Sequence, residues 1–226
     1  MKKTLLLIII LCVILLSCIT NNAGTVTDFS EAPLAGMVYD SEHNPCNGAI
    51  IIVDGKIGPT TDINGRFVIN SLSKGKHSIT VEKEKHEKLT VSFDFLNRSQ
   101  ILYLNLVSIN YIIKNIQRAI EERRLGKAYR LIGRAEKIDT RDPTVMYLKS
   151  IYYIKLKDFY SAQKILQDML SLGYKEPVVY LSLADINQFN FKRKKEAILY
   201  LKEYLKLKIN PKIEERLSKL INNNVK

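Results

Sequence analysis

The sequence predicts a multidomain α and β chain, in which a small N-terminal β-sandwich is followed by a C-terminal α-helical repeat array. The first observation is that residues 34–107 contain short β-rich runs separated by turn signals, with no helical stretch. The second is that residues 108–226 are dominated by helix-forming residues whose apolar side chains recur at helical spacing. The chain of 226 residues is long enough for two small domains.

The first 17 residues have the pattern of an export signal. Two lysines precede an almost unbroken apolar run at residues 4–16, which is shorter than the roughly 20 residues that a membrane-spanning helix needs. The run ends in Leu15-Leu16-Ser17-Cys18, which resembles the lipobox of bacterial lipoproteins. This resemblance implies a lipoprotein signal peptide at residues 1–17 and acyl chains, palmitate among them, on the thiol of Cys18. The alternative is an ordinary secretory signal or an anchor helix with an incidental cysteine.

The segment after the signal is small, polar and without periodicity, so we expect residues 18–33 to be a lipidated tether. A flexible chain of that length spans on the order of 20 Å. Ile19 follows Cys18, where some inner-membrane lipoproteins of enteric bacteria have Asp. We therefore expect the acyl chains to hold the protein on a membrane of the bacterial cell envelope, and we favour the outer membrane over the inner.

Cysteine content and charge narrow the class of protein. Once the signal is removed and Cys18 is acylated, Cys46 is the remaining thiol, so the mature chain forms no internal disulfide. The formal net charge is +12 and the pI about 9.5. In an exported protein this charge indicates an anionic membrane surface or an acidic envelope polymer, not nucleic acid. The alternative is a lysine-rich solvated surface with no specific partner.

The β half has the strand period and the turns of a small sandwich. Strands are expected at Gly36–Asp40, Ala49–Val53, Arg66–Ile69, His77–Glu82, Leu89–Phe95 and Ile101–Val107. The turn signals between them are Asn44-Pro45, Asp54-Gly55, Asn64-Gly65 and Lys74-Gly75. Of these, Asn64-Gly65 is the strong hairpin signal, because both residue types tolerate the positive φ of a tight turn.

Four blocks of this half resemble carboxypeptidase-regulatory-like domains, which are transthyretin-like sandwiches. The blocks are Gly36-x-Val38-x-Asp40 with Pro45, Gly48-Ala49-x-Ile51-x-Val53, Thr61-Asp62-x-Asn64-Gly65-x-Phe67-x-Ile69 and Leu72-x-x-Gly75-x-His77-x-Ile79-x-Val81. The chain departs from the family at Lys85-His86-Glu87, where a Gly-aromatic pair is usual. The resemblance implies an accessory module without catalytic activity.

The helical half repeats at a fixed spacing. Pro143, Pro177 and Pro211 are 34 residues apart, and Ala128, Ala162 and Ala197 are 34 and 35 apart. This spacing resembles tetratricopeptide repeats, in which a small residue on the second helix lets paired helices approach and a proline closes the unit by stopping that helix. We expect one extra residue in the third repeat near Asn190 to Lys194, and a capping helix at Lys212 to Ile221. The alternative is a generic helical bundle.

Neither half shows a catalytic or metal-binding pattern. The histidines, His43, His77 and His86, lie in the β half without ligand spacing. The chain has no phosphate-binding glycine motif and no nucleophile elbow. Asp62 and Asn64 could be an oxygen-rich calcium turn, but an Asx turn explains the same residues. We therefore predict a protein that is not an enzyme and that needs no cofactor or metal.

The resemblance to tetratricopeptide repeats implies a partner bound on the concave face, which the first helix of each repeat lines. The expected lining residues are Tyr147, Ile151, Lys155, Leu181, Asp185 and Gln188. Their alternative role is packing between neighbouring repeats. The predicted function is a membrane-anchored adaptor that binds another envelope protein. The alternative function is a polysaccharide-binding protein that uses the sandwich and the basic surface, although the chain lacks Trp for a sugar platform.

Overall fold

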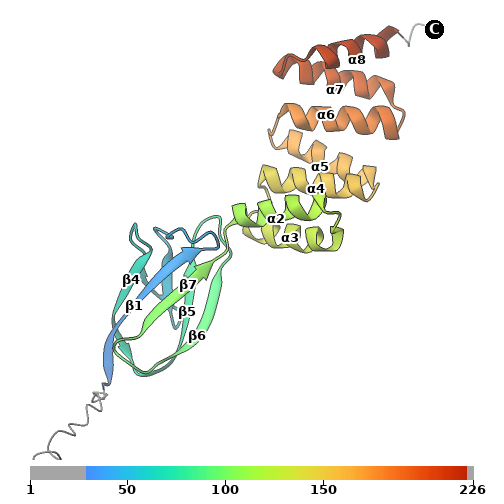
Figure 1. Ribbon diagram of the computed structural model, residues 1–226. Helices are drawn as coiled ribbons and strands as arrows, with labels where there is room; N and C mark the ends of the chain where they lie inside the picture. Colours follow the sequence, from blue (N-terminus) through green and yellow to red (C-terminus); the bar gives the residue numbers. More distant parts are fainter. Residues whose placement is uncertain (1–28, 223–226) are drawn as a thin grey trace, which may run out of the picture.

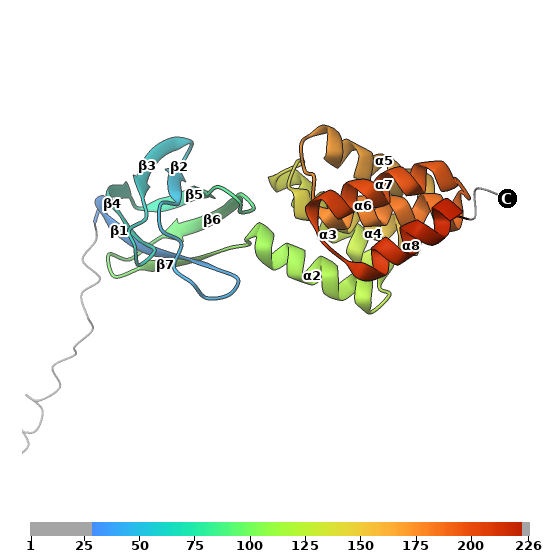
Figure 2. The same cartoon turned by 90° about the horizontal axis from the view of Figure 1, so that it is seen from above.

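The computed structural model describes residues 29–222, in which the sandwich and the helical array lie end to end (Figure 1). The turned view in Figure 2 shows the same separation, with α2 nearest to the sandwich. The predicted signal peptide, Cys18 and the tether as far as residue 28 lie outside the described residues. Within residues 29–222, no helix is both long enough and apolar enough to cross a membrane.

The N-terminal domain consists of two sheets around a shared core. Its strands are β1 (Glu31–Asp40), β2 (Ile50–Val53), β3 (Lys56–Thr60), β4 (Arg66–Ser73), β5 (Gly75–Glu82), β6 (Leu89–Phe95) and β7 (Ile101–Leu106). The first sheet has the order β4-β1-β7 and the second the order β3-β2-β5-β6. Neighbouring strands are antiparallel except β1 and β7, which run parallel. The predicted β-sandwich is confirmed.

Alternating apolar side chains build the core between the sheets, because successive residues of a strand point to opposite faces. Leu34 and Val38 of β1 are fully buried, as are Ile79 and Val81 of β5. The free thiol of Cys46 lies in the same core, and burial raises its pKa. The inward positions that strand period indicates in β5 are therefore the ones that the fold buries.

The predicted hairpin at Asn64-Gly65 is wrong. The turn itself forms, with Gly65 at a φ of 74° and the Asp62 carboxylate accepting the N–H groups of Asn64 and Arg66, as in an Asx turn. The strands on either side, β3 and β4, belong to different sheets. The two-residue hairpin lies instead at Asp54-Gly55, where both residues have the positive φ of a type I′ turn. Turn chemistry specifies the local backbone but not which strands pair.

Two strand boundaries also differ from the expected ones. β3 lies outside the predicted strands, because Gly58 and Pro59 interrupt its β-forming pattern. β1 begins at Glu31, inside the range expected for the tether. Phe29 is buried with its ring centroid 5.2 Å from that of Phe95, so apolar packing starts ahead of the first predicted strand.

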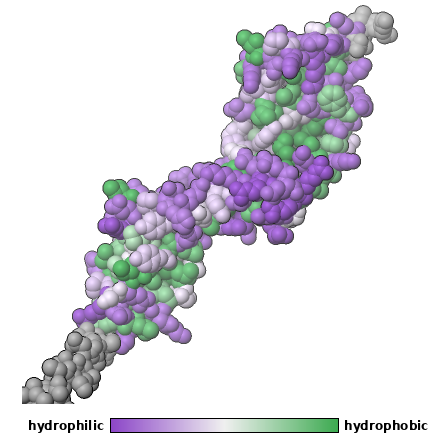
Figure 3. All heavy atoms as spheres, viewed as in Figure 1, coloured by the Kyte–Doolittle hydropathy of each residue, from purple (hydrophilic) through white to green (hydrophobic). Residues whose placement is uncertain are grey.

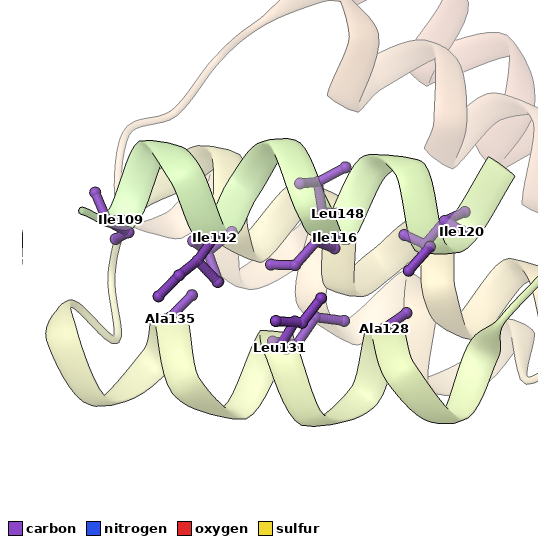
Figure 4. Packing of buried hydrophobic residues seen from close by; sticks show 11 residues of the cluster. Ile109, Ile112, Ile116, Ile120, Ala128, Leu131, Ala135 and Leu148 are labelled. Atoms are coloured by element: carbon purple, nitrogen blue, oxygen red, sulfur yellow. The ribbon is translucent and has the colours of Figure 1, made fainter. Parts of the chain in front are cut away.

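Three helix pairs and a final helix form the described part of the C-terminal domain (Figure 1). The helices are α2 (Ile109–Glu121), α3 (Leu125–Ile138), α4 (Pro143–Lys155), α5 (Phe159–Ser171), α6 (Pro177–Asp185), the π-helical segment η1 (Ile186–Asn190), α7 (Lys194–Leu207) and α8 (Pro211–Asn222). The repeat alanines Ala128, Ala162 and Ala197 are fully buried on the second helix of each pair. Figure 4 shows Ile112 and Ile116 of α2 facing Leu131 and Ala135 of α3.

The role predicted for the repeat prolines is wrong. Pro143, Pro177 and Pro211 do not close a unit. Each is instead the first residue of the next helix, α4, α6 or α8. Proline suits this position because the first helical N–H has no partner inside the helix and the fixed φ of the ring matches helical geometry. The 34-residue spacing therefore marks where helices begin.

The extra residue predicted in the third repeat is accommodated by η1. A π-helical turn holds one more residue than an α-helical turn, so the insertion widens the end of the helix and lengthens no loop. The side chain of Asn187 is fully buried there and donates to the carbonyl of Leu183 at 2.8 Å. α8 covers the last pair, as the predicted capping helix does.

The two domains meet without a linker between β7 and α2. The loop after β5 pairs with the connection: the Glu87 N–H donates to the Val107 carbonyl, and the Ile109 N–H donates to the Lys85 carbonyl, both at 2.8 Å. The Lys85 ammonium also pairs with the carboxylates of Asp139 and Asp142 beyond α3. The helical domain therefore contacts the sandwich through Lys85-His86-Glu87. This is the segment where the chain departs from the carboxypeptidase-regulatory-like pattern.

Candidate partner-binding site

The predicted concave-face residues of α4 and α6 mostly contact the array itself. The Tyr147 hydroxyl lies 3.4 Å from the Ser182 hydroxyl of the next repeat. Ile151 packs against the core of the first repeat, and Leu181 packs against the core beneath α8. Lys155, at the end of α4, is exposed. Three of these positions thus have the alternative role of packing between repeats, and partner binding by any of them stays a prediction.

The two remaining predicted residues are held by the final helix. The Arg216 guanidinium of α8 donates to the Asp185 carboxylate at 2.6 Å and to the Gln188 side-chain oxygen at 2.8 Å. The same guanidinium lies 4.9 Å above the ring of Phe189. Because both polar groups already have partners, a ligand at this end of the array would have to displace Arg216.

A groove between α3 and α4 brings together residues that the sequence analysis did not single out. Its volume is about 320 Å³. The lining residues are Tyr129, Arg130, Ile132, Gly133, Arg134, Glu136, Lys137, Lys149, Tyr152 and Tyr153. In α4 the groove residues Lys149, Tyr152 and Tyr153 stand on a different helical face from Tyr147 and Ile151. The groove is therefore separate from the predicted concave face.

Three tyrosines line this groove, Tyr129 from α3 and Tyr152 and Tyr153 from α4. The ring of Tyr152 lies 6.0 Å from that of Tyr129 and 5.3 Å from that of Tyr153, measured between centroids. Burial, together with the neighbouring Tyr153 and Tyr129, raises the pKa of Tyr152. The phenol therefore stays protonated at neutral pH and is available as a hydrogen-bond donor beside an aromatic surface. Tyr129 is 61% exposed and can contact a ligand directly.

Gly133 keeps the groove open between the tyrosines and the charged residues. A Cβ atom built on this glycine meets no other atom within 4 Å, so the space above it is empty. Gly126 at the start of the same helix is equally unobstructed but does not line the groove. A larger side chain at Gly133 would fill the groove without disturbing the packing of α3.

The charged residues of the groove divide into paired and unpaired cations. The Lys149 ammonium lies 2.6 Å from the Glu136 carboxylate. The Arg134 guanidinium donates twice to the Glu87 carboxylate of the sandwich, at 2.8 and 2.6 Å. Arg130 and Lys137 have no ion-pair or hydrogen-bond partner in the part of the chain that the structure describes. Two exposed positive charges thus remain uncompensated along α3.

The excess positive charge of the protein lies in the helical half. Residues 108–226 carry 25 Lys and Arg against 13 Asp and Glu, whereas residues 18–107 carry 8 against 10. The surface over the first repeat is mostly hydrophilic in Figure 3. The alternative prediction is a polysaccharide-binding protein that uses the sandwich and the basic surface. These two features lie in different domains, because the excess positive charge belongs to the helical half.

Histidines in the sandwich are hydrogen-bonded within the fold. The two ring nitrogens of His77 lie 2.6 Å from the Asp54 carboxylate and 2.8 Å from the Ser73 carbonyl. Burial lowers the pKa of His77, but these two acceptors raise it more, so the net shift is upward. Nδ1 of His86 lies 2.7 Å from the Glu84 carbonyl. Among the described residues, no group of three or more His, Cys, Asp or Glu could hold a metal ion.

One feature of the sequence indicates the groove, but it lies on the second helix of a repeat, whereas the tetratricopeptide resemblance points to the first helices. Arg130, Gly133, Arg134 and Lys137 recur at helical spacing on α3, the second helix of its repeat. A basic stripe interrupted by glycine could have been read as a site from this spacing. The tyrosines of α4 gave no such signal, because apolar and aromatic residues at helical spacing are also expected of packing.

Comparisons with known proteins find likeness only among solved structures: no family model matches the chain, and no curated protein matches it. The first TPR domain of Spaghetti (RPAP3), bound to the HSP90 peptide SRMEEVD, is 15% identical over 52% of this chain and 94% of that chain, with a TM-score of 0.47. YrrB, a TPR protein with an unusual peptide-binding site, is 16% identical over 50% and 59%, with a TM-score of 0.45. A 3-chlorocatechol 1,2-dioxygenase from Rhodococcus opacus is 12% identical over 36% and 60%, with a TM-score of 0.29.

The C-terminal half is a tetratricopeptide-like array. This conclusion rests on its three helix pairs, the 34-residue spacing of the helix-opening prolines, and the buried alanine in the second helix of each pair. Identities of 12 to 16% and TM-scores below 0.5 say nothing about what this chain binds or whether it acts on a substrate. Those questions depend on the groove itself.

Proposed function

We propose that this protein is a non-catalytic adaptor of the bacterial cell envelope, which binds a segment of a partner protein in the groove between α3 and α4. The observation that carries the proposal is an open groove in which three neighbouring tyrosines and Gly133 are lining residues together with two uncompensated cations. An aromatic wall supplies contact area at a small cost in conformational entropy, since a tyrosine has few rotatable bonds. Such a surface suits a peptide segment.

The groove is a better candidate than the predicted concave face because two of its cations are free to engage a ligand. Asp185 and Gln188 are bound to Arg216, and Tyr147 contacts the next repeat. By contrast, Arg130 and Lys137 are exposed and unpaired within the described residues. Binding to these two cations therefore requires no ion pair of the described residues to break.

Anchoring at the membrane belongs to the same proposal. The lipobox-like motif ending in Cys18 supports acylation, and Ile19 supports the outer membrane. The tether would attach the sandwich to the membrane. The helical array would then lie on the far side of the sandwich, because it is at the opposite end from the start of the described chain (Figure 1). The sandwich then acts as a spacer, and Glu87 in its loop after β5 also pairs with the groove residue Arg134.

The test is site-specific photo-crosslinking in the native membrane, with a crosslinking amino acid at Tyr129 in the groove and at Tyr160 on α5 as the control. Tyr160 is exposed to a similar degree, at 69% against 61%. We expect one envelope protein to be captured from Tyr129 and not from Tyr160. The captured protein is then purified and its affinity measured directly. Equal capture from both positions, or none from Tyr129, would overturn the groove assignment.

A matched pair of glycine variants separates blocking of the groove from an effect on the helix. Gly133→Leu fills the groove, whereas Gly126→Leu makes the same change on the same helix outside it. Leucine is a better helix former than glycine by about 0.8 kcal/mol in a helix interior, so neither change should unfold α3. We expect Gly133→Leu to abolish binding of the captured partner and Gly126→Leu to retain it.

A further inference from the structure

The uncompensated cations of the groove indicate what kind of segment it receives. This inference rests on the proposed function and adds the chemistry of the ligand. We infer that the groove binds an acidic segment in the polyproline II conformation, with two carboxylates about three residues apart. One carboxylate pairs with Arg130 and the other with Lys137, while the segment between them lies against Tyr129 and Tyr152.

Charge complementarity selects an acidic ligand. Of the four cations in the groove, Lys149 and Arg134 are neutralised by Glu136 and Glu87. Arg130 and Lys137 are exposed and have no partner among the described residues. The surrounding domain also carries an excess of Lys and Arg, so its field attracts negative charge. An acidic segment removes the repulsion among these cations, and a basic one adds to it.

The spacing of the two free cations favours polyproline II over a β-strand. Arg130 and Lys137 are seven residues apart on α3, which corresponds to about 10.5 Å along the helix axis and nearly two full turns. In polyproline II, residues three apart share a face and are about 9.3 Å apart. In a β-strand, residues on one face are about 6.8 Å or 13.6 Å apart. Polyproline II therefore matches the cations better than a strand does.

The tyrosines agree with the same conformation. Polyproline II segments have no internal hydrogen bonds, and proteins bind them in grooves lined by aromatic side chains. Tyr129, Tyr152 and Tyr153 supply such a lining, and their rings lie 5.3 and 6.0 Å apart. The protonated hydroxyl of Tyr152 can donate to a backbone carbonyl of the segment, which a polyproline II helix leaves exposed.

The experiment measures fluorescence anisotropy of short labelled peptides with the full-length protein in detergent. The peptides are proline-rich and carry one glutamate at position i and a second at position i+2, i+3 or i+4. A further peptide has glutamine in place of both glutamates. We expect the three-position peptide to bind most tightly and the glutamine peptide to lose most of its affinity. Equal affinity at all spacings would overturn the inferred conformation.

Paired variants separate a specific contact from general attraction. Arg130→Gln with Lys137→Gln removes two charges from the groove, and Lys164→Gln with Lys202→Gln removes two exposed charges from α5 and α7. Because the groove variant loses two exposed ion pairs to the ligand, we expect it to bind the three-position peptide roughly tenfold more weakly. The control should bind within about twofold of the unmodified protein. Equal losses in both would overturn the inferred site.

The outcome also distinguishes this inference from the proposed function. If no acidic peptide binds but Tyr129 still captures a partner that Gly133→Leu releases, the adaptor function stands and the acidic segment is wrong. If Tyr129 captures nothing and no peptide binds, both are wrong. If an anionic polysaccharide competes with the peptide and fails to bind the groove variant, the ligand is a polysaccharide. In that case the inference that the groove binds a protein segment is overturned.

Discussion

The Glu87 carboxylate of the sandwich accepts two hydrogen bonds from the Arg134 guanidinium of α3, at 2.8 and 2.6 Å. The pair holds a groove residue from the neighbouring domain, and Glu87 raises the pKa of the guanidinium. The backbone N–H of Glu87 also donates to the Val107 carbonyl at the start of the helical domain. One loop of the sandwich therefore both supports the first repeat and neutralises the central cation of the groove.

Glu87→Gln should strengthen binding of an acidic segment. The substitution leaves the backbone contact to Val107 in place but frees Arg134, which lies between Arg130 and Lys137 on α3. We expect the peptide with glutamates three positions apart to bind about two- to fivefold more tightly, since a partly exposed charge pair contributes up to about 1 kcal/mol. Anisotropy titrations check this. Weaker binding would show instead that Glu87 holds Arg134 in the orientation that the ligand needs.

Thr61→Val should destabilise the sandwich. The buried Thr61 hydroxyl donates to the Cys46 carbonyl and accepts the Ala49 N–H. Valine has the same shape but leaves both backbone groups buried without a partner, which costs about 1–3 kcal/mol for a typical group. The matched control is Thr90→Val, because Thr90 is exposed on β6 and its hydroxyl pairs with that of Thr80 at the surface. Denaturant unfolding should show a change below about 0.5 kcal/mol for the control.

The stability of the sandwich should fall as His77 loses its proton. The pKa of His77 is raised in the folded protein, so the protonated form binds Asp54 and Ser73 better than the neutral form does. This contribution is complete below the unfolded value of 6.5 and is lost as the pH rises through the folded pKa. We expect the free energy of unfolding of the unmodified protein to exceed that of His77→Gln at pH 5, with the difference narrowing at higher pH. A difference that stays constant would contradict the prediction.

Cys18→Ala should abolish the membrane attachment. The variant lacks the thiol that the lipobox-like motif offers for acylation, so a labelled fatty acid should be incorporated into the unmodified protein and not into the variant. Membrane fractionation should move the variant to the soluble fraction. Cys46→Ala is the control, since that thiol is buried in the core. Incorporation that persists in Cys18→Ala would place the lipid elsewhere or show that the signal is not cleaved there.

The division into a sandwich and a repeat array was predictable because each depends on the period of apolar residues. The buried Ile79 and Val81 of β5, and the buried Ala128 and Ala162, lie where strand and helical spacing place them. Strand pairing was less predictable. Asn64-Gly65 has the residue types of a hairpin turn, but the strands on either side of it belong to different sheets. Which strands pair depends on long-range packing, and a local sequence pattern does not indicate it.

The candidate site was not predicted, for a related reason. The concave face follows from the family resemblance, which does not indicate whether its side chains already have hydrogen-bond or ion-pair partners within the fold. Arg216 lies 31 residues after Asp185 and forms an ion pair with it only once α8 packs against the last pair. Likewise, Glu87 and Arg134 are 47 residues apart and in different domains. Which cations remain unpaired depends on these long-range contacts.

The parallel pairing of β1 and β7 determines at which end of the sandwich the chain leaves the domain. Because its first and last strands run the same way, the polypeptide enters at one end of the domain and leaves at the opposite end (Figure 1). An antiparallel pair would have returned it to the side of Phe29. The six residues of β7 alone add about 20 Å of reach. The groove between α3 and α4 therefore lies beyond the end of the sandwich that is opposite to the start of the described chain (Figure 1).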